Sequence, residues 1–256
     1  RIGHWEVENE EDFDLGMGIW ENDTGSCFGG PLAAAYADHL RASYKAIKTA
    51  DPTATVLFGG LAYDRFYNGP AGYSPTGPFD YEFVGNTLAS LTTRYSRESG
   101  YPFFDWMAIH IYNDFRNNWD GAQPYNQELA AKVAHLRNHQ MVRSGVFDLR
   151  SRPIVITEVG LSSAPADQWT SRDEALQAAY PGQVLIRALS EGVPLVLWFV
   201  GKDRFTGSCS NIYDWQTFGL VRSKAVADAA ATCVPSPLGG YSAPVSQRPA
   251  AIRTTP

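Results

Sequence analysis

The chain alternates short apolar runs with longer segments whose apolar residues recur at helical spacing. Such alternation predicts strands followed by helices, which is the pattern of βα units around a parallel sheet. Both a doubly wound sheet and a (β/α)8 barrel are built in this way, so the pattern alone leaves both open. The predicted strands are Ile2–Val7, Thr55–Phe58, Phe104–Ile111, Ile154–Thr157 and Leu195–Val200.

The segments between these runs have the apolar spacing of amphipathic helices. They cover Leu32–Ile47, Val84–Tyr95, Leu129–Leu136 and Ala175–Glu191, and a last short helix is expected at Ser223–Thr232. The first of them should end at Asp51, because Pro52 cannot continue a helix. Pro181 lies inside the fourth, where it should kink the helix or break it in two.

Composition narrows the class of protein. The 256 residues are 44% hydrophobic and 19% charged, with a formal net charge of -6. This hydrophobic content can form a core, which excludes a disordered chain. The acidic balance argues against nucleic acid or an anionic membrane as the main partner. Apolar stretches such as Val193–Val200 are too short to span a bilayer.

The three cysteines and the C-terminal segment carry less information. Cys27, Cys209 and Cys233 have no metal-binding spacing, so no metal is predicted. A disulfide, most simply between Cys209 and Cys233, would fit an extracellular or otherwise exported protein. Residues 235–256 are rich in Pro, Ser and Ala and are expected to form a tail or linker.

Carboxylates follow two of the predicted strands. Glu8, Glu10, Glu11 and Asp12 come after the first strand, and Glu158 ends the fourth, an otherwise apolar run. Carboxyl ends of parallel strands form the ligand-binding edge of such folds. Two carboxylic acids at this edge suffice to split a glycosidic bond. An acidic solvated loop is the simpler explanation for Glu11 and Asp12, but not for Glu158, whose burial requires partners.

Five segments resemble parts of retaining glycoside hydrolases of clan A, in the order of that family. Trp5–Glu10 resembles the family's W-E-x-x-N-E motif at barrel strand 4, and Asp105–Tyr112 resembles the strand 6 motif D-x-x-x-x-H-x-Y. Ile156–Gly160 is similar to the strand 7 motif. Leu197–Phe199 matches the end of strand 8, and Phe218–Val221 resembles the segment that follows it. The β-xylosidase/α-L-iduronidase family is the most similar branch.

The resemblance implies a role for each matched residue. Glu10 corresponds to the general acid/base, Glu158 to the nucleophile, and Asn9 to the residue that binds the sugar 2-hydroxyl. It further implies that Tyr112 reaches the nucleophile, that His110 lines the same pocket and that Trp198 stacks under the sugar. His110 could instead be a hydrogen-bonded core residue, and Trp198 could fill the barrel mouth.

The resemblance also implies a (β/α)8 TIM barrel of which residues 1–234 hold strands 4 to 8. A whole barrel takes about 250 residues, and strands 1 to 3 have no counterpart here. We therefore expect a partial barrel that folds poorly by itself, since inward-facing side chains would lack partners.

The function expected from these observations is hydrolysis of a carbohydrate substrate with retention of configuration, without metal or organic cofactor. The alternative from another class is a non-catalytic carbohydrate-binding or scaffold protein on a degenerate barrel. The presence of both Glu10 and Glu158 argues against that alternative. A serine hydrolase of the α/β class is excluded because the chain has no G-x-S-x-G motif.

Overall fold

The structure is a computed structural model that describes residues 2–12, 32–62, 80–112, 128–161, 174–201 and 220. It comprises two compact units. The first is Arg1–Glu158 with Ala188–Val196, and the second is Val159–Arg187 with Leu197–Pro256. None of the described helices combines the length and the apolar character that a membrane crossing requires.

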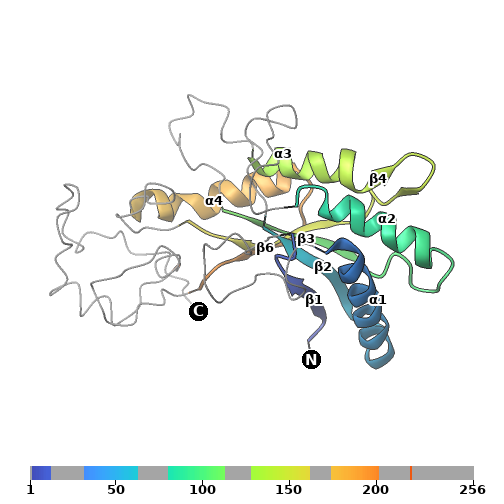
Figure 1. Ribbon diagram of the computed structural model, residues 1–256. Coiled ribbons are helices and arrows are strands. Elements are labelled where there is room, and N and C mark those ends of the chain that lie inside the picture. Colours follow the sequence, from blue (N-terminus) through green and yellow to red (C-terminus); the bar gives the residue numbers. More distant parts are fainter. Residues whose placement is uncertain are drawn as a thin grey trace, which may run out of the picture. The chain divides into compact units, whose positions relative to one another are not determined.

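A five-stranded sheet organises the fold (Figure 1). Its strands are β1 (His4–Asn9), β2 (Thr55–Leu61), β3 (Trp106–Ile111), β6 (Ile154–Val159) and β7 (Val196–Trp198), and they lie in that order. β1, β2 and β3 are parallel neighbours. The order follows the chain without the reversal that a doubly wound sheet has at its switch point, so the observed topology favours the barrel type of α/β fold.

Helices connect the strands, as the periodicity predicts. They are α1 (Ala33–Ala50), α2 (Phe83–Tyr95), α3 (Glu128–His135), which continues as the π-helical turn η4 (Leu136–Gln140), and α4 (Glu174–Ser190). α1 and α2 lie side by side, joined by the ion pair of Arg94 with Asp38 (Figure 1). The hairpin of β4 (Val142–Arg143) and β5 (Phe147–Asp148) was not predicted, because two-residue strands are too short to show alternation.

Tyr36 of α1 anchors the helices to the sheet. Its ring is fully buried and packs on Phe58 of β2 and Phe83 of α2. Its hydroxyl donates to the carbonyl of Val7 (2.9 Å) and accepts from the amide of Gly59 (2.7 Å). The helix layer is thereby fixed against both β1 and β2 close to their carboxyl ends.

The observed bounds correct several sequence-based expectations. β1 ends at Asn9 rather than Val7, so Glu10 follows the strand directly. β2 continues through Gly59 and Gly60, which a sequence pattern treats as strand breakers. α4 runs unbroken through Pro181, so the predicted break does not occur. The buried side chains of Tyr180 and Val184 keep one apolar face packed on both sides of the proline.

Several predictions fall outside the described residues. These are the last helix at Ser223–Thr232, the three cysteines with their disulfide, and the tail at 235–256.

Candidate active site

Glu10 lies directly after the carboxyl end of β1. Its amide donates to the carbonyl of Gly60 on β2 (2.9 Å), and its backbone has a left-handed conformation, with φ of 59°. Glu8 also has a positive φ, 66°, and its side chain pairs with His39 of α1 (2.7 Å). Left-handed conformations are uncommon for side-chain-bearing residues. The chain therefore turns sharply here, which aims the Glu10 side chain at β3.

Glu158 lies one residue before the end of β6, on the same sheet. The hydroxyl of Tyr112, which follows β3, donates to its Oε2 at 2.6 Å. This hydrogen bond fixes the orientation of the carboxyl group. The Glu158 side chain is partly exposed, at 27%, and residue 112, which follows the neighbouring strand, supplies its hydrogen-bond donor.

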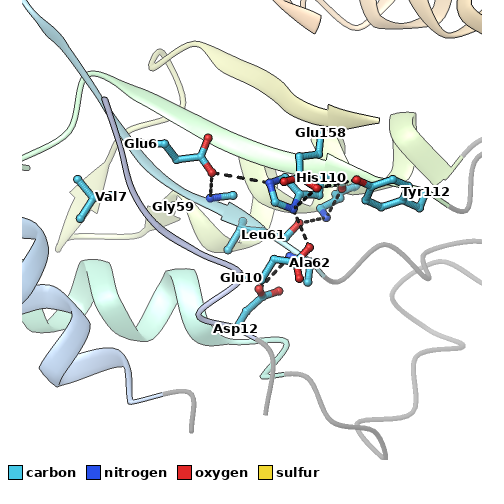
Figure 2. A network of polar contacts seen from close by, with 12 residues as sticks. Glu6, Val7, Glu10, Asp12, Gly59, Leu61, Ala62, His110, Tyr112 and Glu158 are labelled. Atoms are coloured by element: carbon cyan, nitrogen blue, oxygen red, sulfur yellow. Dashed lines mark hydrogen bonds and ion pairs between the residues drawn. The ribbon is translucent and has the colours of Figure 1, made fainter. Parts of the chain in front are cut away.

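His110 of β3 joins the two carboxylates, as Figure 2 shows. Its Nδ1 lies 2.7 Å from Glu10 Oε1 and 3.8 Å from Glu158 Oε2. One oxygen of Glu10, one of Glu158 and a ring nitrogen of His110 all lie within 4.8 Å of one another. The structure therefore brings together four of the six residues expected at the site: Glu10, His110, Tyr112 and Glu158.

The environment of His110 favours its protonated form. The ring is 1% exposed, and burial by itself lowers the pKa of a histidine. The carboxylates of Glu10 and Glu6 and the charge of Glu158 outweigh burial and raise the pKa of His110 from 6.5 to about 9. In its protonated form the ring donates its Nδ1 proton to Glu10.

This protonation decides whether the cluster could hold a metal. Metal ligation by histidine needs a neutral imidazole with a free lone pair. The Nδ1 atom of His110 lies 2.7 Å from Glu10 Oε1, and the surrounding carboxylates favour the cationic ring. A metal ion bound by Glu10, His110 and Glu158 would have to displace that proton.

Two glycines of β2 make room for the cluster. A Cβ atom at Gly60 would lie 2.1 Å from His110 Nε2 and 2.7 Å from Glu6 Oε1. A Cβ at Gly59 would lie 2.6 Å from the carbonyl oxygen of Val7. Real Cβ atoms do not approach so closely, so bare backbone at both positions is what allows β1, β2 and β3 to place their side chains here.

Lys132 of α3 is a participant that the sequence interpretation missed. Its side chain is 1% exposed, and its Nζ donates to the carbonyls of Leu61 (2.7 Å) and His110 (2.8 Å). The ammonium thus ties together the carboxyl ends of β2 and β3. The available signal was a lysine within the apolar stripe of Leu129, Val133 and Leu136, where a charged residue is unexpected.

Asn9 and Trp198 have no described contact with this cluster. Asn9 is the exposed last residue of β1. Trp198 belongs to the second unit, where its ring meets Tyr180 edge to face at 5.7 Å. Their roles in binding a sugar remain predictions.

The acidic residues after Glu10 are not a solvated loop, and that expectation is wrong. Glu11 and Asp12 are each 3% exposed. Asp12 Oδ1 accepts from the amide of Ala62 (2.9 Å), and its carbonyl accepts from the amide of Asp80 (2.7 Å). The amide at the end of β2 thus compensates the burial of the Asp12 carboxylate, which no sequence pattern could reveal.

Comparison with known proteins gives structural likeness only. No family model matches the chain, and no curated protein matches it. Among solved structures, β-glucuronidase of Bifidobacterium dentium has a TM-score of 0.49 and 13% identity. The match covers 86% of this chain and 28% of that one.

Two further structures are similar to a comparable extent. A GH128 (subgroup V) exo-β-1,3-glucanase of Cryptococcus neoformans has a TM-score of 0.48 and 14% identity, over 89% of this chain and 68% of that one. The family 51 α-L-arabinofuranosidase AbfB of Bifidobacterium longum has a TM-score of 0.45 and 14% identity. That match covers 86% of this chain and 39% of the other. All three are glycoside hydrolases. With each TM-score below 0.5, the function has to be argued from this chain's own residues.

The raised pKa of His110 predicts that the protein loses stability in mildly alkaline solution. A group whose pKa is raised on folding contributes stability that is fully present below its unfolded value, about 6.5, and is lost as pH rises through about 9. The loss should be on the order of 3 kcal/mol. Urea unfolding at intervals between these pH values measures it. The variant His110→Gln should flatten the dependence, and equal slopes in both proteins would contradict the assignment.

Proposed function

We propose that this protein is a retaining glycoside hydrolase, with Glu10 as general acid/base and Glu158 as nucleophile. The observation that carries the proposal is the approach of one oxygen of each carboxylate to within 4.8 Å. Retaining enzymes hold their two carboxyl groups about 5–5.5 Å apart, whereas inverting enzymes need about 6.5–9.5 Å to admit a water molecule. The separation supports the retaining mechanism.

In the first step of the proposed reaction, the carboxylate of Glu158 attacks the anomeric carbon. The bond from this carbon to the leaving oxygen breaks, and the proton of Glu10 moves to that oxygen. The hydrogen bond from Tyr112 supports this role, because it orients the Glu158 carboxyl group before the attack. The product of this step is a glycosyl ester on Glu158.

In the second step, water attacks the anomeric carbon and gives a proton to Glu10. The ester bond to Glu158 breaks, so the sugar leaves with its original configuration after two inversions. His110 supports the change of role of Glu10, since a donor 2.7 Å away stabilises the carboxylate that accepts the proton. Asn9, at the end of β1, is proposed to bind the sugar 2-hydroxyl, and Trp198 to stack on the sugar.

Trapping of the covalent intermediate tests the proposal. The probes are activated aryl glycosides of glucose, xylose, mannose and galactose, fluorinated at the carbon next to the anomeric centre. Fluorine slows both steps, while a good leaving group lets the first proceed, so the ester should accumulate. Mass spectrometry should find one glycosyl group, attached to Glu158. Attachment to another residue would overturn the assignment, and oligosaccharide binding without ester or hydrolysis would indicate a carbohydrate-binding protein.

A further inference from the structure

Glu6 lies in the middle of β1 and faces the same histidine as Glu10 does. Its Oε1 accepts a hydrogen bond from the amide of Gly60 (2.8 Å), which fixes the carboxylate against β2. The same oxygen lies 3.7 Å from His110 Nε2 (Figure 2). Nothing in the proposed mechanism uses this residue, although its side chain is only 25% exposed.

The two ring nitrogens of His110 therefore face different carboxylates. Nδ1 contacts Glu10, and Nε2 faces Glu6, with no hydrogen-bond partner of its own among the described residues. A proton on Nε2 is attracted by the carboxylate of Glu6, whereas a lone pair there would be repelled. Glu6 thus favours every form of the ring that carries the Nε2 proton.

We propose that Glu6 is a positioning residue that holds the Nε2 proton of His110 so that the Nδ1 proton can pass to Glu10. This inference rests on the proposed role of Glu10 as acid/base. The proton moves from His110 Nδ1 to the Glu10 carboxylate and from there to the leaving oxygen. When water later attacks the ester, its proton returns to Glu10 and then to Nδ1, so the cycle is balanced.

The choice of tautomer is why Glu6 matters in this scheme. After giving up its Nδ1 proton, His110 is neutral and keeps its proton on Nε2, which is the tautomer that Glu6 stabilises. Without the Glu6 charge, a neutral ring would prefer its proton on Nδ1, where Glu10 accepts it. That tautomer carries a single ring proton, so it cannot give a proton to Glu10 and remain neutral. A carboxylate that sets the tautomer of a catalytic histidine has the same effect in serine proteases.

Within the described residues, every charged or titratable group that faces His110 either stabilises the protonated ring or leaves its protonation unchanged. Glu6 and Glu10 come from β1 and its end, and Glu158 comes from β6. Tyr112 acts through Glu158, to which it donates. The ammonium of Lys132 donates to the carbonyl of His110 rather than to the ring. The raised pKa of His110 agrees with a net anionic environment.

The test is the variant Glu6→Gln, which removes the charge and keeps an oxygen for the amide of Gly60. Nuclear magnetic resonance of the imidazole nitrogens reports both the pKa and the tautomer of His110. We expect the pKa to fall by about one unit or more, as for loss of an opposite charge within about 4–6 Å. We also expect the Nδ1–H tautomer to replace the Nε2–H tautomer when the ring is neutral.

Activity gives the second readout. In Glu6→Gln, kcat for substrates with poor leaving groups should fall, and the alkaline limb of the pH profile should move to lower pH. Glu6→Asp keeps the charge and should restore part of both properties. Glu8→Gln is the matched control, because Glu8 lies on the same strand but pairs with His39. It should leave the pKa and tautomer of His110 close to those of the unmodified protein.

The outcomes separate this inference from the proposed function. An unchanged pKa and tautomer in Glu6→Gln, or equal changes in Glu8→Gln, would overturn the role of Glu6 whatever the activity. If the tautomer changes in a folded protein that hydrolyses no glycoside, the proposed function and the proton transfer to the leaving oxygen are refuted. The conclusion that Glu6 stabilises the Nε2 proton of His110 would remain valid.

Discussion

Replacement of Glu158 by alanine is expected to abolish turnover, with a fall in kcat of roughly four orders of magnitude or more. The reason is that the proposed ester cannot form without the carboxylate, and the remaining groups cannot attack the anomeric carbon. The methyl side chain leaves space beside Tyr112, where a small anion can enter. Added azide should therefore restore activity and give a glycosyl azide of inverted configuration, since only one displacement then occurs.

Glu10→Ala should behave differently. Loss of the Glu10 carboxyl group should lower kcat about 10²–10⁴-fold for substrates with poor leaving groups. The fall should be much smaller for substrates with good leaving groups, because these need little protonation. Measuring kcat across aryl glycosides of different leaving-group acidity separates the two roles. The matched control is Glu82→Gln at the start of α2, a carboxylate with no contact to the cluster in the described part of the chain. Equal losses on all substrates in both variants would contradict the assignment.

Gly60→Ala is also expected to have a large effect, although it adds only one methyl group. The new carbon would lie 2.1 Å from His110 Nε2 and 2.6 Å from its Cδ2, and 2.7 Å from Glu6 Oε1. The ring is 1% exposed, so either the ring or the strand that carries residue 60 must shift to relieve this overlap. A displacement of about 1 Å in a catalytic group can cost about 10²-fold in rate.

The readouts are kcat and the nuclear magnetic resonance signals of His110. Gly60→Ala should lower the pKa of His110, because the shift separates its nitrogens from Glu6 and Glu10. Gly182→Ala, in α4, is the matched control, since a Cβ there meets nothing within 4 Å. Alanine has the higher helix propensity, so this control should gain about 0.5–1 kcal/mol of stability. An active Gly60→Ala variant with an unchanged His110 pKa would show that the cluster is not confined as described.

The sequence predicted the elements well, because each depends on local periodicity. The helix that includes Leu40 and the helix that includes Leu88 lie where their apolar spacing puts them, and Asp51 ends the first of them. The strands lie in the predicted segments, with their ends displaced by a few residues. Local preference is overruled where tertiary contacts intervene, as at Pro181, where a packed helix face continues without the break that was one of the two predicted outcomes.

The candidate site was predictable only in part. Glu10 and Glu158 could be singled out because a carboxylate at the end of an apolar strand needs a reason to be there. His110 left two interpretations open, and the structure combines them, since the ring is buried and still contacts both carboxylates. Glu6 was part of a matched motif, but nothing in the pattern distinguished it from the other acidic residues beside it.

The sequence by itself determined the succession of strands and helices and the presence of carboxylates at two strand ends, since these follow from residue order. Only the tertiary structure decided which groups share a proton. The distances of 2.7 Å and 3.7 Å on either side of the His110 ring join it to carboxylates that lie 100 and 104 positions earlier in the chain. Gly60 illustrates the reason: it lies just beyond the strand that the sequence predicts, and in the sheet its missing side chain leaves the space that His110 occupies.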